Sequence, residues 1–522
     1  MSLKSIGFRD IINVKVYFLR IGNTRQLFSP LDNFRDLHMI NYERRVQNLV
    51  EEARKAAKVI LEYVEKGNRI SVFSHMDADG ISAAGIIGVT LSRIEARFRI
   101  RIERWFDEKI ASEIAAEKDS LPILTDMGSG YIDILNEALK GRDLVILDHH
   151  QPSGKHEETF VHVNPEIFGI DGARDISGAG VTYLMSREIS EKNKDLAYLA
   201  VIGALGDMQD KNEGQSLGGV NEIIVKDAIE SGHLKVETDL LFFGRETRPI
   251  HKALAYTTTP FIPGLSGEED KCLTLLTELG IKIKENDRWR ALRDLSQEEK
   301  RKIFSGISDY LASRGYKLDI AKKLIGAVYV LVNEEQWTPL RDAREFALLL
   351  NATGRMEKPG LGVAICMGDR GRCLEEANET LEEYRRTIIE KLRWLDEHSD
   401  RLEEMKGIYV LHGGQNINEK MISAISTILS TSMPNVEKPI IAYSIVPEEK
   451  LIKVSARATD SLTRKGINLG EIMRISAEKF SGKGGGHDVA AGAQIPLNEK
   501  EHFLRFVDDL ITRKLKENED KS

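Results

Sequence analysis

Three short apolar segments, each ending in acidic or imidazole side chains, constrain the fold of this chain more than any other sequence feature. The segments span residues 70–74, 121–125 and 143–147. The side chains that follow them are His75, Asp77 and Asp79 after the first, Asp126 after the second, and Asp148, His149 and His150 after the third. Helical patterns separate the segments, and this alternation predicts an α/β fold with a mainly parallel sheet. Because parallel strands end at one edge, we expect the three groups to converge there.

A fourth acidic residue, Asp207, follows Gly206 at the end of an apolar helix predicted over residues 196–205. A single Asp-x-Asp pair more often caps a helix or closes a turn, so the prediction of a site depends on the convergence of all four groups. Carboxylates with imidazoles and no thiolate favour Mn²⁺ or Mg²⁺ over structural zinc. The ligands suffice for two divalent ions, which clamp both oxygens of a phosphoryl displacement when they lie about 4 Å apart.

The composition excludes several other classes of protein. The 522 residues are 41% hydrophobic and 30% charged, and no apolar run approaches the roughly 20 residues of a membrane helix. The net charge of −8 argues against a generally basic nucleic-acid binder but leaves a local positive groove open. The 3 cysteines are too few and scattered for a disulfide framework, so we expect a cytoplasmic protein without a membrane partner.

The C-terminal half carries a second, independent pattern. Predicted strands over residues 440–446 and 451–457 are followed by Gly484, Gly485, Gly486 and His487, and then by Ala-Ala-Gly at 490–492. Consecutive glycines give backbone amides room to approach a phosphate. A flexible connector is the alternative interpretation of such a glycine-rich loop.

Both patterns resemble known family motifs. Ser-His-Met-Asp-Ala-Asp-Gly at 74–80, Thr-Asp-Met-Gly at 125–128, Asp-His-His at 148–150 and Gly-Asp at 206–207 resemble the four motifs of the DHH phosphoesterase superfamily. The stretch at 484–492 resembles the GGGH-x-x-A-A-G signature of the DHHA1 domain. The resemblance implies a parallel-sheet DHH domain and a smaller α/β DHHA1 domain facing it across a cleft.

The resemblance also implies roles for individual residues. His75 and Asp77 resemble ligands of one ion, while Asp79, His149 and Asp207 resemble ligands of the other. Asp126 resembles the bridging carboxylate, His150 faces the scissile phosphate, and Asp148 supports the imidazoles; Asp126, Asp148 and His150 are thus the catalytic candidates. The implied substrate contacts, including an arginine whose fork suits phosphate, are Ser455, Arg457, Gly484, Gly485, Gly486 and His487.

We expect five regions along the chain. They are an N-terminal extension of uncertain structure (1–40), the DHH domain (41–235), a linker or helical intermediate region (236–334), the DHHA1 domain (335–515) and a charged tail (516–522). The extension is either a short strand over 14–21 or a segment before an alternative start at Met39.

Three further features have open interpretations. Arg245, Arg248 and Lys252 near Tyr256 are either contacts to a nucleic-acid backbone or part of a solvated hinge. A long helix over 374–405 binds a partner or packs on its own domain. Asn351 and Arg355 are candidate contacts to a nucleic-acid strand.

The sequence therefore resembles an archaeal RecJ-like exonuclease. The resemblance implies metal-dependent hydrolysis of phosphodiester bonds in single-stranded DNA or RNA, in DNA replication or repair, with the GINS replisome complex as a partner. The alternatives are a small-substrate phosphoesterase of the oligoribonuclease or cyclic-dinucleotide type, and a non-catalytic replisome scaffold. The sequence leaves four properties open: the polarity of digestion, the preference for DNA or RNA, the choice of Mn²⁺ or Mg²⁺, and the oligomeric state.

Overall fold

The protein is described by a computed structural model that covers residues 30–257, 260–316, 319–432 and 437–519. The chain divides into two compact units, residues 1–44 and 45–522. Helix α2 (Pro30–Glu65) runs through the boundary between them. The helix therefore begins 11 residues, about three turns, before the domain start expected at residue 41. The strand considered for 14–21 lies outside the described residues. In the second unit, α2 buries Leu49, Ala53 and Ile60 at helical spacing.

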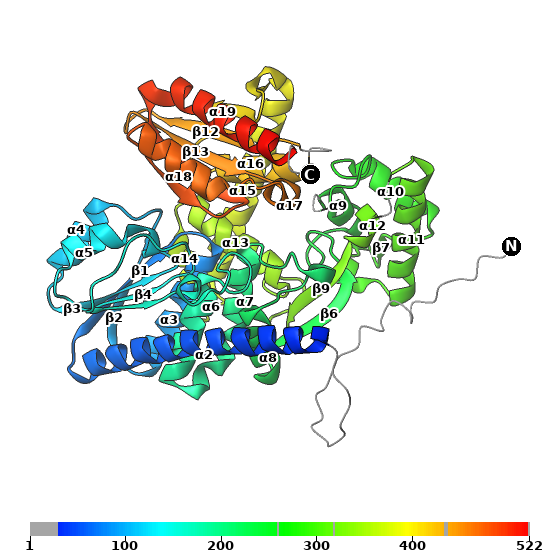
Figure 1. Cartoon of the computed structure of the whole chain (residues 1–522). Helices are drawn as coiled ribbons and strands as arrows, with labels where there is room; N and C mark the ends of the chain where they lie inside the picture. Colours follow the sequence, from blue (N-terminus) through cyan, green and yellow to red (C-terminus); the bar gives the residue numbers. More distant parts are fainter. Residues whose placement is uncertain (1–29, 258–259, 317–318, 433–436, 520–522) are drawn as a thin grey trace. The chain divides into compact units, whose positions relative to one another are not determined.

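The first sheet is fully parallel, as predicted. Its strands are β1 (Arg69–His75), β2 (Arg97–Glu103), β3 (Ser120–Thr125), β4 (Leu144–Leu147) and β5 (Phe160–Val163). They lie in the order β2-β1-β3-β4-β5, and every neighbouring pair is parallel (Figure 1). The chain reverses its direction of winding between β1 and β3, which is where ligands bind in open α/β sheets.

Helices cover both faces of this sheet. On one face, α3 (Ala78–Arg93) and α6 (Gly178–Ile189) pack on the strands, and α7 (Ala197–Gly206) packs on both helices. On the other face, α4 (Glu108–Ala116) and α5 (Ile132–Ala138) bury apolar side chains in a common cluster with β1, β3 and β4. Because both faces are covered, β3 is buried along its whole length, and its central Leu-Pro-Ile-Leu run is apolar without alternation.

Residues 240–324 form a small domain with its own hydrophobic core. Its helices are α9 (Ile250–Ala255), α10 (Glu269–Glu278) and α11 (Gln297–Ser313), and a hairpin joins β7 (Lys284–Glu285) to β8 (Arg288–Trp289). Antiparallel strands β6 (Leu234–Leu240) and β9 (Ile325–Leu331) flank this domain in the sequence.

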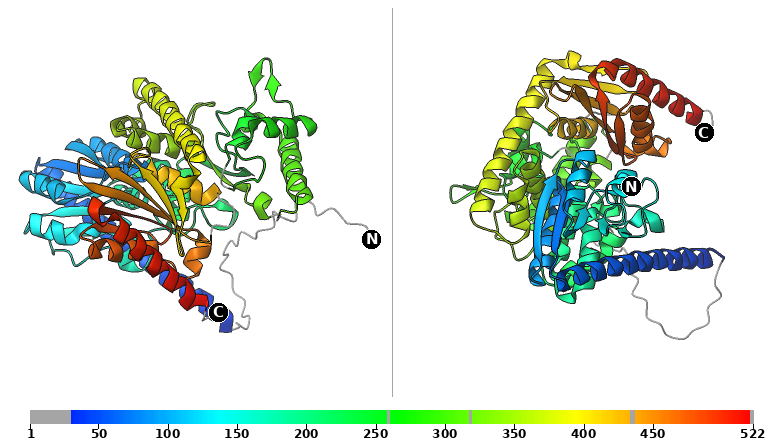
Figure 2. Two further views of the ribbon diagram at one scale, coloured as in Figure 1. Left: turned by 90° about the horizontal axis from the view of Figure 1, so that it is seen from above. Right: turned by 90° about the vertical axis from the view of Figure 1, so that its left-hand side faces the viewer.

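The C-terminal sheet is mixed, which confirms the second α/β domain. Its strands lie in the order β10-β11-β12-β13-β15-β14. They span β10 (Leu402–Glu404), β11 (Tyr409–Gly414), β12 (Ile440–Val446), β13 (Leu451–Arg457), β14 (Lys483–Gly486) and β15 (Ala490–Pro496). Helix α16 (Ile422–Ser432) packs on β12 and β13, while α18 (Leu469–Lys479) and α19 (Lys500–Glu519) pack together and on β15 (Figure 2).

The connection between the domains is largely helical. Helix α13 (Ala343–Arg355) packs on α3 and α7, and α14 (Pro359–Cys366) packs on α3. Helix α15 (Arg372–Glu397) ends eight residues before the expected position 405, because a 3₁₀ turn at 399–401 leads into β10. The remaining helices are α8 (Val220–Glu230), α12 (Asp319–Lys322) and α17 (Asp460–Arg464).

The packing of α13 and α14 bears on the boundary expected at residue 335. Both helices lie after that boundary, yet they pack on helices of the first domain. The expected boundaries stay predictions, and this packing favours a start of the last domain nearer to residue 400. Within the described part of the chain, no helix is long and apolar enough to cross a membrane.

Candidate metal centre and adjoining histidines

The strand-terminal side chains meet at the carboxyl edge of the first sheet, as predicted. His75 ends β1, and its Nδ1 lies 2.9 Å from Asp77 Oδ2 and 3.6 Å from Asp126 Oδ2. Asp77 also caps α3, since its Oδ1 accepts a hydrogen bond from the amide of Gly80 at 3.0 Å. These three residues form a first group whose ligand atoms lie close enough to hold one cation.

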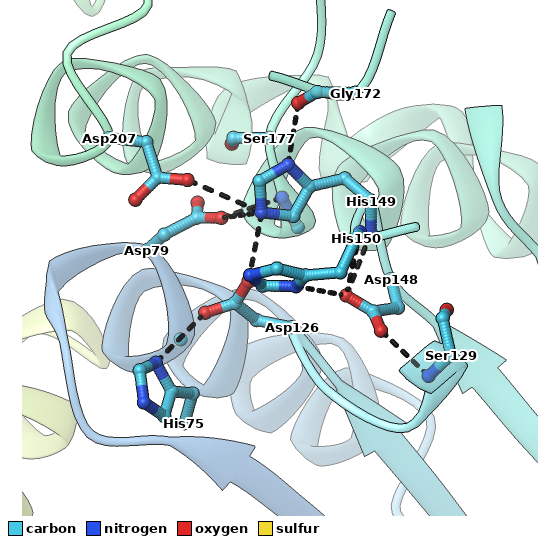
Figure 3. A network of polar contacts seen from close by, with 12 residues as sticks. His75, Asp79, Asp126, Ser129, Asp148, His149, His150, Gly172, Ser177 and Asp207 are labelled. Atoms are coloured by element: carbon cyan, nitrogen blue, oxygen red, sulfur yellow. Dashed lines mark hydrogen bonds and ion pairs between the residues drawn. The ribbon is translucent and has the colours of Figure 1, made fainter. Parts of the chain in front are cut away.

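A second group lies on the other side of Asp126. Nε2 of His149 is 3.2 Å from Asp126 Oδ1, 3.3 Å from Asp207 Oδ2 and 3.7 Å from Asp79 Oδ2. Figure 3 shows Asp126 between His75 and His149. One oxygen of Asp126 thus faces each group, which is the arrangement expected of a bridging carboxylate.

Several polar atoms at the centre of this cluster are buried without a hydrogen-bond partner. They are both carboxylate oxygens of Asp126, Nδ1 of His75 and Nε2 of His149. Asp126 is 2% exposed, and burying polar atoms without partners costs about 1–3 kcal/mol each. A divalent cation on either side of Asp126 would satisfy these atoms, and the oxygen and imidazole ligands fit Mn²⁺ or Mg²⁺.

The protonation of the cluster also indicates a cation site. Burial and the neighbouring Asp126 raise the pKa of Asp79 to about 7. Burial and the charge of Asp79 raise the pKa of Asp207 well above its ordinary value. Burial opposes the charge on His149, but the surrounding carboxylates, Asp126 foremost, raise its pKa well above the ordinary value. The cluster therefore holds protons that a cation would displace on binding.

Asp148 and the backbone orient the two histidines. Nδ1 of His149 donates to the carbonyl of Gly172 at 2.6 Å, which leaves Nε2 facing the carboxylates. Asp148 accepts hydrogen bonds from the amide of Ser129 at 2.9 Å and the amide of His149 at 2.8 Å. Its Oδ1 also lies 2.8 Å from Nδ1 of His150. Burial alone would raise the pKa of Asp148, but the neighbouring His150 lowers this pKa below its ordinary value.

The N-terminus of α6 is a part of the site that the sequence prediction missed. The amides of Gly178 and Ala179 donate to the two oxygens of Asp79 at 2.6 and 3.0 Å. A Cβ atom at Gly178 would lie 2.7 Å from the Cβ of Asp126, so a glycine is needed for this close approach. The small residues at 178–180, which follow the N-cap Ser177, were the signal available in the sequence.

The C-terminal domain adds His487 to the site. The ring of His487 stacks on that of His150 with centroids 5.1 Å apart and lies 5.4 Å from that of His149. Burial and the adjacent His150 and His149 lower the pKa of His487 well below its ordinary value. The expected glycine-rich loop is a strand in the structure, since Gly484, Gly485 and Gly486 pair with β15. Because β14 ends the order of the sheet, it pairs with a strand on one side only.

Among the described residues, no interaction brings the remaining candidates, Ser455 and Arg457, into contact with the carboxylates. Ser455 Oγ lies 2.9 Å from Ser426 Oγ on α16. Arg457 donates to Thr427 Oγ1 at 2.8 Å and to Ser423 Oγ at 2.7 Å. Burial and the charge of Arg355 lower the pKa of Arg457 to about 10. Within the described residues no carboxylate forms an ion pair with Arg457, whose partners are two hydroxyl groups and the carbonyl of Ala456.

Asn351 and Arg355 make structural contacts, and the nucleic-acid contacts considered for them stay predictions. Asn351 Oδ1 accepts a hydrogen bond from the amide of Ala78 at 3.0 Å and so holds the acidic loop against α13. Arg355 donates to the carbonyl of Lys420 at 3.1 Å.

Comparison with protein families gives three matches in chain order. They are the N-terminal domain of the DHH family over residues 69–204, the DHH-CID domain over 242–325 and the DHHA1 domain over 405–513. The first and third contain the two sets of motifs, and the second coincides with the small domain that has its own core. These matches and the site define a phosphoesterase-type protein of two α/β domains with an inserted domain.

The chain belongs to the DHH/DHHA1 superfamily, as a RecJ-like member. It is 33% identical over 475 residues to the uncharacterized protein MJ0831 of Methanocaldococcus jannaschii, covering 90% of this chain and 99% of that protein. It is also 27% identical over 240 residues to the single-stranded-DNA-specific exonuclease RecJ of Thermus thermophilus. That match covers 43% of this chain but only 34% of the exonuclease.

Solved structures show the same fold. RecJ of Thermus thermophilus in complex with Mn²⁺ aligns with a TM-score of 0.54 at 18% identity, over 88% of this chain and 55% of that one. CDC45 of Entamoeba histolytica aligns with a TM-score of 0.60 at 12% identity, over 89% of this chain and 99% of that one. The fold alone therefore fits both an exonuclease and a CDC45 protein, and the site must decide between them.

Proposed function

We propose that this protein is a metal-dependent exonuclease that hydrolyses phosphodiester bonds of single-stranded DNA or RNA. The observation that carries the proposal is Asp126, whose two buried and unpartnered oxygens each face a separate group of ligands. A site for two divalent ions fits phosphoryl displacement. The similarity to RecJ, which is named as a single-strand-specific exonuclease and was solved with Mn²⁺, supports this substrate class.

We propose the following roles for the residues. His75, Asp77 and Asp126 hold one ion, and Asp79, Asp126, His149 and Asp207 hold the other. When bound, the ions supply a nucleophilic water and neutralise charge that develops on the phosphate. His150 and His487, whose rings stack beside the ligands, contact the scissile phosphate.

The orientation of these two histidines follows from their contacts. Asp148 fixes His150 through Nδ1, so Nε2 of His150 is directed away from that carboxylate. Neutral His487 can donate one hydrogen bond to a phosphate oxygen. Ser455, Arg457 and the amides of Gly484, Gly485 and Gly486 stay proposed contacts to more distant parts of the substrate.

A non-catalytic scaffold is the second candidate, because the fold also resembles CDC45. Such a protein needs no complete set of ligands, whereas all of the ligands predicted here converge in the structure. The association with DNA replication or repair, and the GINS complex as a partner, stay predictions based on the family resemblance.

The test is a time course on single strands of about 5 to 40 nucleotides, a range that includes the footprint of typical single-strand-binding grooves. Strands labelled at either end are incubated with Mn²⁺, Mg²⁺ or a chelator. We expect progressive shortening that needs metal, is lost in Asp126→Ala and persists in Asp133→Ala, a control at an exposed aspartate of α5. Cleavage limited to the shortest strands would favour the small-substrate enzyme. No cleavage with any metal would favour the scaffold.

A further inference from the structure

We infer that the residues flanking α9 at its two ends, together with α15, form a second binding surface for the phosphate backbone of single-stranded nucleic acid. Its residues are Arg248, Tyr256, Arg385 and Arg393, and we call it the arginine surface. The inference rests on the proposed nuclease function and extends the substrate contact beyond the carboxyl edge. Helices α9 and α15 are labelled in Figure 1.

Arg248 is held between aromatic rings and lacks an anionic partner. Its guanidinium lies 4.6 Å from the ring centre of Tyr256 and 5.2 Å from that of Phe243. Its Nε is buried and has no hydrogen-bond partner. Within the described residues, no carboxylate forms an ion pair with Arg248. A rigidly held guanidinium with free donors is the side chain best suited to a phosphate.

The fold fixes the position of this arginine. The buried carboxylate of Glu345 on α13 accepts hydrogen bonds from the amide of Glu246 at 3.0 Å and the hydroxyl of Thr247 at 2.8 Å. These bonds hold the turn that precedes Arg248 against α13, and α15 packs on the same helix. Arg248 therefore follows a turn that two hydrogen bonds anchor to α13, the helix on which α15 also packs.

Helix α15 brings further positive charge to the same place. Burial and the charge of Arg385 lower the pKa of Arg248, so the two guanidinium groups repel each other. The hydrogen bond to Glu269 and burial raise the pKa of Tyr256, and the charges of Arg248 and Arg393 oppose this rise. Nε of Arg385 is also buried without a partner. Like charges held together in this way favour an anion between them.

The neighbouring carboxylates already have partners. Glu382 pairs with Arg385. Glu269 accepts from the hydroxyl of Tyr256 at 2.5 Å and lies 3.7 Å from Nζ of Lys252. Arg393 is exposed, and in the part of the chain that the structure describes it forms no ion pair. Glu382 and Glu269 are thus paired, whereas Arg248 and Arg393 form no ion pair among the described residues.

Beside Arg393 the surface of α15 is hollowed. The hollow has a volume of about 530 Å³ and is lined by Arg386, Ile389, Glu390, Arg393, Trp394 and Glu397. One of its two carboxylates, Glu390, lies 3.1 Å from Nζ of Lys391. The indole of Trp394, stacked on His398 with centroids 5.0 Å apart, offers an aromatic face. Aromatic rings beside backbone-binding cations are typical of surfaces that bind single strands without sequence preference.

The test compares Arg393→Gln with Arg372→Gln, a matched change at an exposed arginine of the same helix that pairs only with Glu376. For a 40-nucleotide strand we expect Arg393→Gln to raise KM about tenfold, with little change in kcat, because a charge-assisted contact is lost. The slope of the logarithm of the binding constant against the logarithm of the salt concentration should become shallower by about 0.7, the contribution of one phosphate contact in a single strand. Arg372→Gln should match the wild type in both measurements.

Other outcomes separate this inference from the proposed function. If wild-type protein does not cleave any strand, the proposed function fails, while fluorescence anisotropy with a labelled strand still tests the arginine surface. If wild-type protein cleaves but Arg393→Gln and Arg248→Gln keep the KM and salt slope of the wild type, the arginine surface is contradicted. A protection experiment with an arginine-modifying reagent gives a further test. If inorganic phosphate protects the arginine surface to the same extent as a long strand, the inference is overturned, because the surface then binds a free anion.

Discussion

At the scale of single residues, Gly203 shows how a missing side chain shapes the candidate metal centre. A Cβ atom at this position on α7 would lie 2.3 Å from Asp79 Oδ1 and 2.6 Å from the Cβ of Ala179. Both neighbours are fully buried and cannot move freely. Asp79 would therefore shift relative to His149 and Asp207.

We predict that Gly203→Ala lowers the affinity for Mn²⁺ by about 10- to 100-fold, as changes in the residues that position ligands commonly do. Calorimetric titration with Mn²⁺ measures this. Gly360→Ala is the control, because a Cβ there meets nothing within 4 Å. Equal affinities in the two variants would mean that Asp79 is not a ligand.

A second prediction at this scale concerns His162, which is 3% exposed. Its Nε2 lies 2.8 Å from Ser129 Oγ, and burial lowers its pKa to about 4. In the unfolded chain a histidine has a pKa of about 6.5. Between these values the unfolded state binds more protons, so the stabilisation is fully present above pH 6.5 and is lost as the pH falls toward 4.

The loss from this one group is on the order of 3 kcal/mol in the free energy of unfolding. Urea denaturation of the wild type and His162→Gln, followed across this pH range, isolates the contribution. The wild type should lose more stability than the variant as the pH falls. Parallel curves would contradict the assignment of a buried neutral imidazole.

At the scale of elements, α13 acts as a support for the acidic loop after β1. Asn351 accepts the hydrogen bond from the amide of Ala78, and a Cβ at Gly354 would lie 1.8 Å from the carbonyl oxygen of Met76. The helix thus lies directly against the loop that carries Asp77. The two segments are 273 positions apart in the sequence.

We predict that Asn351→Ala lowers the affinity for Mn²⁺ about tenfold, because the amide of Ala78 is left without its partner and the loop relaxes. Asn351→Asp keeps an acceptor and should retain more of the affinity. Metal titration with both variants checks this. If the alanine variant binds as the wild type does, the loop needs no support from α13.

These elements also show what could be predicted from the sequence. Asp77, Asp126 and His149 converge as predicted, because parallel strands place their carboxyl ends at one edge whatever the details of packing. The support by Asn351 was not predictable, since no local pattern pairs residues so far apart. The glycines at 484–486 were mistaken for a loop because pairing with β15 is a long-range contact.

Boundaries of helices were also only partly predictable. Helix α2 extends back to Pro30, before the domain start expected at residue 41, and α15 ends at Glu397, before the expected position 405. The small domain over residues 240–324 draws its core from segments far apart in the sequence, so local periodicity did not indicate a separate domain.

At the scale of the whole molecule, the carboxylate cluster links folding to metal binding. Asp77, Asp79, Asp126 and Asp207 lie around two histidines at one edge of the sheet, and their mutual repulsion opposes folding when no cation is bound. Binding to the folded state alone stabilises it by about 2.7 kcal/mol at a free metal concentration 100 times Kd.

We therefore predict that Mn²⁺ raises the Tm and that a chelator lowers it. Asp133→Ala should show the same shift as the wild type, whereas Asp126→Ala should show a much smaller one. Differential scanning calorimetry with and without metal measures the effect. A metal-induced shift that is equal in both variants would place the stabilising cation elsewhere.

In the proposed metal centre, two ions share Asp126 at the carboxyl edge of the sheet. Titration with Mn²⁺, followed by electron paramagnetic resonance, tests it most directly, because two ions bridged by one carboxylate are magnetically coupled. We expect two Mn²⁺ per chain with a coupled spectrum in the wild type, and loss of the coupling in Asp126→Ala. A single uncoupled Mn²⁺ per chain at saturation would contradict the account.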